Sequence, residues 1–137
     1  MDREIKFRGM LRGGTWVYGG VVKTVQNSYC ILSGEIYHIE LGKDTKNLMQ
    51  FNAVKYKTVG QYIELKDKNS REIYEGDIAE VECECGYKDK MPVEWGYNGF
   101  KLKQYISHRY PSGELEFNHT ERVEVIGNIY ENPELLK

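Results

Sequence analysis

Six side chains in this 137-residue chain are of the types that bind zinc, namely Cys30, His38, Cys83, Cys85, His108 and His119. Zinc sites use thiolates and imidazoles in a tetrahedral set, and two to four residues commonly separate the paired cysteines. Only one residue separates Cys83 from Cys85, so on an extended strand their sulfur atoms lie on one face about 7 Å apart. That distance is long for a shared metal ion unless the strand ends there. We interpret these cysteines as small apolar strand residues and expect neither a metal site nor a cofactor.

A second group of side chains that could do chemistry is the acidic run Glu75, Asp77, Glu80, Glu82 and Glu84. Paired carboxylates can transfer protons or hold Mg²⁺. The alternation of side chains after Asp77, however, predicts a strand whose glutamates form a solvated stripe that opposes edge-to-edge aggregation. We expect Asp77 to close a turn by accepting backbone N–H groups. The chain also lacks a phosphate loop and a nucleophile elbow, so we expect no enzymatic activity and assign no catalytic residue.

Cations and aromatic side chains are interleaved near residue 105, in the set Phe100, Lys101, Lys103, Tyr105, His108, Arg109 and Tyr110. Small barrels bind single-stranded nucleic acid by stacking bases on aromatic rings beside cations, so this set is a candidate binding surface. A strand with one apolar face and one charged face would give the same pattern. We add a tryptophan that we expect to be exposed, and the candidate binding residues are then Trp95, Lys101, Lys103, Tyr105 and Arg109.

The composition limits the classes of function that the chain can serve. It has 19 Lys and Arg residues and 21 Asp and Glu residues, a formal net charge of −2. This charge argues against nucleic-acid binding by electrostatics alone, although a local basic patch stays open. The charged N-terminus lacks the apolar core of a signal peptide, and no apolar run reaches the roughly 20 residues that span a bilayer. With an odd number of cysteines, which indicates reduced thiols, we expect a soluble cytoplasmic protein without membrane contact.

The first half of the chain has the pattern of paired strands joined by glycine turns. Residues 4–22 predict a β-hairpin around Gly13-Gly14, with a break or bulge in its second strand at Gly19-Gly20. The next predicted elements are a hairpin of residues 29–32 and 35–39, a stretch at 42–53 that is mostly loop, and a strand at 54–59.

The second half contains the clearest strand, residues 78–85, which follows the turn Glu75-Gly76-Asp77. The other predicted elements are a loop at 66–71, a charged turn at 86–92, a hairpin of 93–95 and 99–102 about an Asn-Gly turn, a strand at 121–130 and a helical turn at 133–136. The segment Ile73-Tyr74-Glu75 is echoed by Ile129-Tyr130-Glu131, which predicts two similar strand ends anchored by tyrosines.

Short strands recur with turns every 8–12 residues and without a long helical period, which indicates an all-β or mainly β fold. We predict a small, partly open SH3-like barrel with additional N-terminal β-hairpins. The predicted division is an N-terminal hairpin region, residues 1–57, and a barrel-like region, residues 58–137, with one continuous domain as the alternative.

Three segments of the chain carry a resemblance to a known family. They are Lys6-Phe7-Arg8-Gly9 with Trp16-Val17-Tyr18-Gly19, the central residues 59–78, and the closing residues 125–136. In this order they resemble the signatures of the YopX-like proteins of bacteriophages and prophages. Ser70 stands where the family has glycine, and residues 23–53 and 84–120 match no part of the pattern. The resemblance implies a mobile-element origin, a bacterial cytoplasm and a mainly β fold, and it supplies no activity.

Two functions of different classes are consistent with these observations. The first is a non-enzymatic protein-binding module of a phage or prophage, whose partner is another protein or a second copy of the chain. Trp16, Trp95 and the eleven tyrosines would make the contacts, together with exposed sheet edges. The alternative is a small β-barrel that binds nucleic acid through the basic and aromatic residues near Tyr105.

Overall fold

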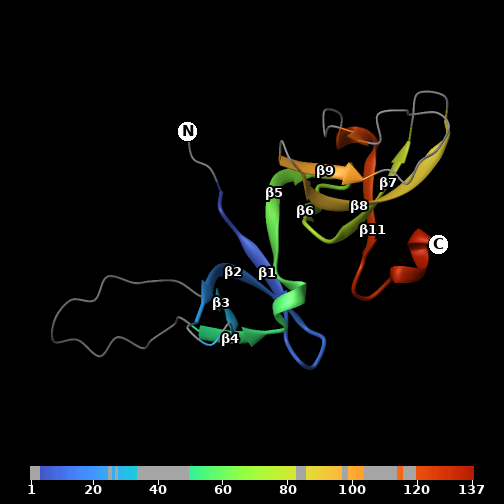
Figure 1. Cartoon of the computed structure of the whole chain (residues 1–137). Helices are drawn as coiled ribbons and strands as arrows, with labels where there is room; N and C mark the ends of the chain where they lie inside the picture. The colour runs from blue at the N-terminus through green and yellow to red at the C-terminus, as the bar shows by residue number, and fades with distance from the viewer. Residues whose placement is uncertain are drawn as a thin grey trace, which may run out of the picture. The chain divides into compact units, whose positions relative to one another are not determined.

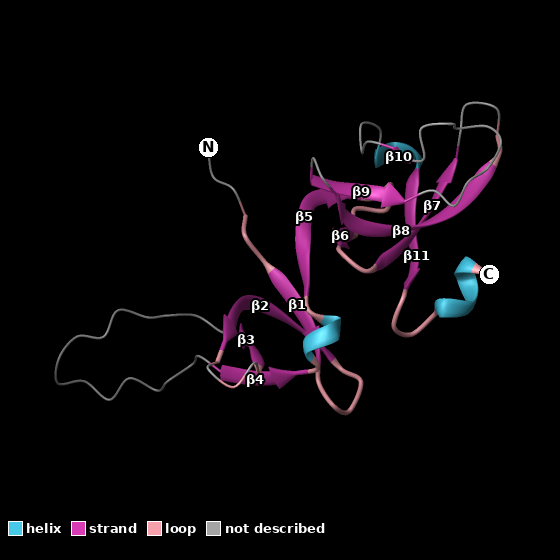
Figure 2. Ribbon diagram, in the orientation of Figure 1, coloured by secondary structure: helices cyan, strands magenta, loops and turns pink. Residues whose placement is uncertain are grey.

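The computed structural model describes residues 4–24, 26, 28–33, 50–82, 86–96, 99–103, 114–115 and 120–137. The chain forms two compact units, an N-terminal unit of residues 4–61 and a C-terminal unit that contains residues 62–137 (Figure 1). Antiparallel strands dominate both units, and the helical segments within the described residues are short 3-10 turns (Figure 2). The all-β prediction is confirmed, and the described strands form sheets without closing into a barrel. No helix in the described part is long and apolar enough to cross a membrane.

The N-terminal unit is an antiparallel arrangement in which each strand pairs with its neighbour in the chain. Its elements are β1 (Phe7–Met10), β2 (Trp16–Lys23), β3 (Tyr29–Ser33), β4 (Gln50–Val54), the 3-10 turn η1 (Tyr56–Thr58) and the start of β5 (Gly60–Lys66). The predicted hairpin of β1 and β2 is confirmed, and Gly14 in its turn has a positive φ of 91°. β1 also pairs with Gly60 and Gln61 of β5, and the side chain of Ile31 in β3 is fully buried.

The strand β2 changes partner at its two glycines. Gly19 pairs with Phe7 of β1, whereas Gly20 pairs with Leu32 of β3. Gly19 has a φ of 154°, and a Cβ atom there would lie 1.7 Å from the carbonyl oxygen of Leu32. Only glycine allows the two backbones to approach this closely. The predicted break at this point is therefore a continuous strand that passes from one neighbour to the next.

One prediction in the N-terminal unit is wrong, and another is tested only at its end. The polar stretch 42–53, expected to be mostly loop, ends in the strand β4, which pairs along its whole length with β3, and residues 42–49 lie outside the described residues. The alternating residues 54–59, expected to be a strand, contain η1 instead. In both places, contacts with segments distant in sequence override the local pattern. The predicted strand at 35–39 lies outside the described residues.

The C-terminal unit contains a five-stranded antiparallel sheet in the order β10-β9-β8-β7-β11. Its strands and turns are β6 (Glu72–Tyr74), β7 (Asp77–Glu82), β8 (Lys88–Gly96), β9 (Gly99–Lys103), β10 (Glu114–Leu115), η2 (Thr120–Arg122), β11 (Val123–Asn128) and η3 (Pro133–Leu136). β6 pairs with the part of β5 that lies in this unit. The buried hydrophobic core consists of Ile63, Ile73, Ala79, Met91, Val93, Val123 and Val125.

Most predicted elements of this unit are confirmed, with changes at their ends. The hairpin of β8 and β9 is present, and η3 is a helical turn that begins with Pro133. The predicted charged turn at 86–92 is wrong beyond Tyr87, because β8 begins at Lys88 and pairs with β7 up to Pro92. The strand predicted at 121–130 is shorter, and its register shifts between Val125 and Gly127.

The two Ile-Tyr-Glu segments lie next to each other. The backbone N–H of Ile129 donates to the carbonyl oxygen of Gly76 at 2.9 Å. Gly76 has a φ of 90°, and a Cβ atom there would lie 2.9 Å from the ring of Tyr130. Tyr74 is 2% exposed and its ring centroid lies 5.5 Å from that of Tyr62. The prediction that a tyrosine anchors each of these strand ends is therefore confirmed.

A buried carboxylate covers the outer edge of β11. Asp67 is 6% exposed, and its Oδ1 accepts the N–H groups of Asn69 at 2.9 Å and Arg71 at 3.0 Å. Its Oδ2 accepts the N–H of Val125 in β11 at 2.9 Å. The N–H of Lys68 donates to the carbonyl oxygen of Val123, also in β11. The loop after β5 therefore satisfies backbone groups that an edge strand would otherwise leave unpaired.

We expect Asp67→Asn to lower the free energy of unfolding by about 2–3 kcal/mol, because an amide nitrogen would face backbone donors in place of a carboxylate oxygen. Urea denaturation followed by circular dichroism measures this change. Asp89→Asn is the control, since Asp89 accepts only a local, exposed bond from the N–H of Lys90 and should change stability by less than about 0.5 kcal/mol. Equal effects of the two substitutions would show that Asp67 does not hold the edge.

Candidate functional site

The sequence placed its candidate binding residues between positions 95 and 109. The structure places the backbone of Trp95 in β8, and that of Lys101 and Lys103 in β9. Lys101 pairs with Glu94, and Lys103 pairs with Glu114 in β10. The side chains of these residues, together with all of Tyr105 and Arg109, lie outside the described residues, so this surface stays a prediction.

The hypothetical zinc ligands also fall mostly outside the described residues, in the set His38, Cys83, Cys85, His108 and His119. Cys30 lies in β3, where it is half-buried. Among the described side chains, no group of three or more His, Cys, Asp or Glu residues could hold a metal ion.

The described residues of the acidic run are of two kinds. Asp77 is a buried carboxylate that holds a turn, whereas Glu80 and Glu82 of β7 reach the solvent. Asp77 is 1% exposed, and its Oδ2 accepts the N–H of Tyr74 at 2.8 Å, so its predicted turn-closing role is confirmed. Glu80 is half-buried and its Oε1 lies 3.4 Å from Nζ of Lys88. Glu82 is exposed, as predicted, and Glu84 lies outside the described residues.

Residues of both charges meet around a cleft of about 50 Å³ in the C-terminal unit, lined by Lys68, Glu80, Glu82, Lys88, Glu121, Arg122 and Glu124. The hydrogen bond between Lys68 Nζ and Glu124 Oε2, 2.8 Å long, raises the pKa of Lys68 and lowers the pKa of Glu124. Each charged form is stabilised by the other. Because Lys68 and Lys88 are paired with carboxylates of the same unit, we interpret this cluster as a solvated ion-pair surface.

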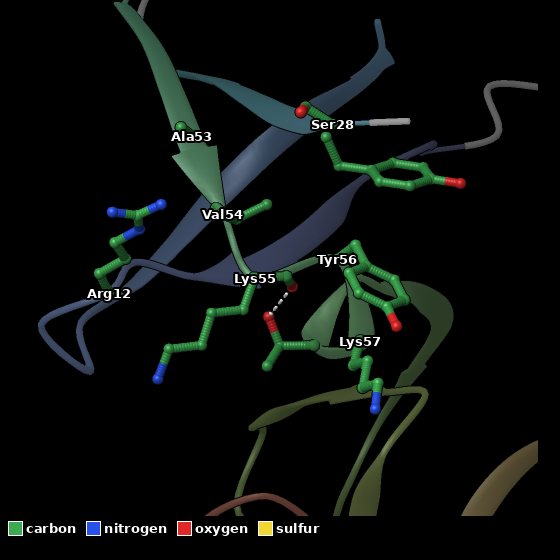
Figure 3. A pocket seen from close by; sticks show the side chains of 9 residues that line it. Arg12, Ser28, Ala53, Val54, Lys55, Tyr56 and Lys57 are labelled. Atoms are coloured by element: carbon green, nitrogen blue, oxygen red, sulfur yellow. Dashed lines mark hydrogen bonds between the residues drawn. The ribbon is translucent and has the colours of Figure 1, made fainter. Parts of the chain in front are cut away.

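A larger groove, of about 480 Å³, lies within the N-terminal unit. We call it the basic groove, and its lining residues are Arg12, Ser28, Tyr29, Ala53, Val54, Lys55, Tyr56, Lys57 and Thr58. They come from the turn after β1, the start of β3, the end of β4 and the whole of η1. Figure 3 shows the side chains of Arg12 and Lys55 on one side of the groove, and those of Tyr56 and Lys57 on the other.

One threonine fixes the position of η1 against β1. The hydroxyl of the buried Thr58 donates to the carbonyl oxygen of Lys55 at 2.6 Å. Its Oγ1 also accepts the N–H of Met10 at 2.9 Å. The N–H of Lys55 donates to the carbonyl oxygen of Met10 at 2.9 Å. Gly9 adds a close approach, because a Cβ atom there would lie 2.8 Å from Val54. Strand β1 therefore holds the segment that presents Lys55, Tyr56 and Lys57.

The basic groove is strongly cationic. Arg12, Lys55 and Lys57 line it, and the described residues that line it include no Asp or Glu. The ammonium of Lys23 lies 5.9 Å from the ring centroid of Tyr29, and that of Lys57 lies 5.8 Å from the ring centroid of Tyr56. Each tyrosine of the groove therefore has a lysine beside its ring.

The charge of the chain is divided between the two units. Residues 4–61 contain eight Lys and Arg residues and four Asp and Glu residues, a formal charge of +4. Residues 62–137 contain ten and sixteen, a formal charge of −6. The net charge of −2 is thus an average over two units of opposite sign.

The basic groove was missed because its central residues were assigned to a strand. Lys55, Tyr56 and Lys57 form the same kind of basic and aromatic alternation that was noticed near Tyr105. That similarity was a usable signal. Arg12 and Tyr29, in contrast, reach the site only through the pairing of β1, β2, β3 and β4, which the local pattern does not reveal.

Comparisons with known proteins agree with the signature segments. The family model described as YopX protein matches residues 6–137 and confirms the resemblance. The crystal structure of protein EF1440 from Enterococcus faecalis is similar with a TM-score of 0.56 and 21% identity. That match covers 99% of this chain and 100% of the other, and it shows the fold alone. A search of the curated proteins found no match.

We expect Thr58→Val to lower the free energy of unfolding by about 1–3 kcal/mol, because the buried N–H of Met10 would lose its acceptor. Thr58→Ser keeps the hydroxyl and should restore most of this stability. Urea denaturation measures both variants, with Thr15→Val at an exposed position as the control. If valine and serine destabilise the protein equally, the hydroxyl does not carry the link to β1.

Proposed function

The chain belongs to the YopX protein family, and we propose that it is a non-enzymatic binding module whose basic groove holds an anionic partner. It acts as an accessory protein of a phage or prophage in the bacterial cytoplasm. The resemblance of its signature segments to phage and prophage proteins supports that origin and setting. The basic groove supports the binding role.

The observation that carries the proposal is the charge of the groove lining. Three cations, Arg12, Lys55 and Lys57, line the groove, and no carboxylate is found among the lining residues that the structure describes. Side chains of one sign around a concave surface concentrate the field and attract ligands of opposite charge. The ion-pair surface of the C-terminal unit differs, because there Lys68 and Lys88 have acidic partners within 4 Å.

The groove has the lining of a binding surface. Val54, Ala53 and the aromatic rings of Tyr29 and Tyr56 supply apolar area beside the cations. Ligand sites commonly combine apolar walls with a few polar groups that fix orientation. Within the described part of the chain, the lining contains no His, Cys, Asp or Glu, the side chains that most often serve as general acids, bases or metal ligands.

We expect the protein to be retained on immobilised heparin, a polyanion without nucleobases, despite its formal charge of −2. The double variant Lys55→Ala/Lys57→Ala should elute at a lower salt concentration, because it removes two of the three groove cations. The control is Lys66→Ala/Lys90→Ala, two exposed lysines of the C-terminal unit that should leave retention unchanged. Failure of the wild type to bind heparin, or an equal shift in the control, would contradict the proposal.

A second candidate function, binding to another copy of the chain, is favoured by a different surface. Val22, Cys30 and Ala53 share one face of the N-terminal sheet by register, and Phe51 lies two residues from Ala53 on that face. Phe51 is 68% exposed and Val22 is 38% exposed. Exposed apolar side chains on a sheet are characteristic of contact surfaces. Trp16, expected to be an exposed contact, is half-buried, with the Arg8 guanidinium 4.4 Å from its ring centroid.

If this face joins two copies, sedimentation analysis should show a concentration-dependent dimer. Phe51→Ser should then shift the equilibrium to the monomer, because it removes a large exposed hydrophobic side chain from the contact. Ile5→Ser is the control, since Ile5 is also 66% exposed but lies outside the strands. A monomer at every concentration would remove this candidate and leave the groove proposal unaffected.

A further inference from the structure

We propose that the anionic partner of the basic groove is a single-stranded nucleic acid, with bases stacked on the tyrosine rings and phosphates bound by the adjacent cations. This inference rests on the proposed function and names its ligand class. The cation content alone would suit any polyanion. The placement of the two tyrosines beside lysines favours one class of polyanion, the single-stranded nucleic acids.

The groove repeats one arrangement twice. The Lys57 ammonium lies 5.8 Å from the ring centroid of Tyr56, and the Lys23 ammonium lies 5.9 Å from that of Tyr29. A nucleic-acid strand also repeats one arrangement, because every flat base is followed by a phosphate. A ring that stacks on a base therefore has a cation within reach of the neighbouring phosphate. An acidic peptide repeats charge without a flat ring and would leave the tyrosine faces unused.

Exposure of the rings favours a single strand over a duplex. Tyr56 is 61% exposed and Tyr29 is half-buried at the edge of the groove. Base–aromatic stacking needs a base whose face is open, which a single strand offers along its length. The bases of a duplex are stacked on each other, so a duplex would meet only the cations. The groove volume, about 480 Å³, is of the size that holds small organic groups.

The remaining cations add candidate phosphate contacts. Arg12 and Lys55 lie to one side of the segment that leads from β4 into η1 and Lys57 lies to the other, so a strand that crosses this segment would meet cations on both sides (Figure 3). A planar guanidinium can bind two phosphate oxygens at once, whereas an ammonium acts as a compact point charge. Arg12 therefore supplies an oriented phosphate contact, and the lysines supply charge that follows the backbone.

The test is fluorescence anisotropy with a labelled oligothymidylate, over a series of salt concentrations. Tyr56→Ala should weaken binding about 5- to 150-fold, the range of one lost stacking contact, and should leave the salt dependence unchanged. Tyr56→Phe keeps the ring and should bind nearly as well as the wild type. Tyr87→Ala, another exposed tyrosine that lies in the C-terminal unit, is the matched control.

The cation variant should give the opposite signature. Lys55→Ala/Lys57→Ala should reduce the slope of log affinity against log salt by about 1.4, since each phosphate contact on a single strand contributes about 0.7. The inference is supported if Tyr56→Ala lowers the affinity without changing the salt dependence, while Lys55→Ala/Lys57→Ala lowers the salt dependence. Loss of affinity in the Tyr87 control to the same extent would contradict it.

Three outcomes overturn the inference in distinguishable ways. If Tyr56→Ala binds the oligothymidylate as the wild type does while heparin is still retained, the groove holds polyanions by charge alone. If a duplex or a polyglutamate chain binds more tightly than the single strand at equal salt, the ligand class is wrong while the proposed function stands. If neither heparin nor the oligothymidylate binds, both proposals fail.

Discussion

The hydroxyl of Thr58 is the contact on which the basic groove depends. It lies in a buried position and joins the carbonyl oxygen of Lys55 to the N–H of Met10, 48 residues away in sequence. Without it, η1 would be a three-residue turn with no regular hydrogen-bond ladder to hold it, and such turns are weak by themselves. The exposed side chains of Lys55, Tyr56 and Lys57 project from a segment that this hydroxyl holds against β1, together with the bond from the N–H of Lys55 to the carbonyl oxygen of Met10. A binding surface on a short turn is thereby given the rigidity of the sheet.

The strands at the edges of the two units differ in what covers them. The outer edge of β11 is covered by the loop of Asp67, which supplies both an acceptor and a donor to the strand. In the N-terminal unit, β4 pairs with β3 on one side and presents the exposed Phe51 on its face. Covering an edge suppresses strand addition, whereas an apolar exposed residue beside a paired edge invites contact. The C-terminal unit therefore has a covered edge, and the N-terminal unit carries the two surfaces that we propose for binding.

Local patterns predicted the fold class and most of the C-terminal unit, because its turns are encoded by residues close in sequence. Asp77 was expected to close its turn with backbone amides and does so at Tyr74. The end of β4 and η1 could not be predicted in this way. The strand at 50–54 follows a polar stretch without a regular period and gains its structure from pairing with β3, and the alternation at 54–59 has the same period as a strand. Where long-range pairing or a single buried hydroxyl decides the backbone, the local period does not carry the information.

The site itself was less predictable than the fold for a related physical reason. A net charge of −2 argues against a polyanion ligand only if the charge is spread evenly, and here it is divided into +4 for residues 4–61 and −6 for residues 62–137. Screening at physiological ionic strength limits the reach of an exposed charge to about 8 Å, so a ligand in the groove would respond mainly to the charges that line it, among them Arg12, Lys55 and Lys57. The quantity that decides binding is therefore the local field at the groove. That field depends on how the strands bring the cations together, and it cannot be read from the average composition.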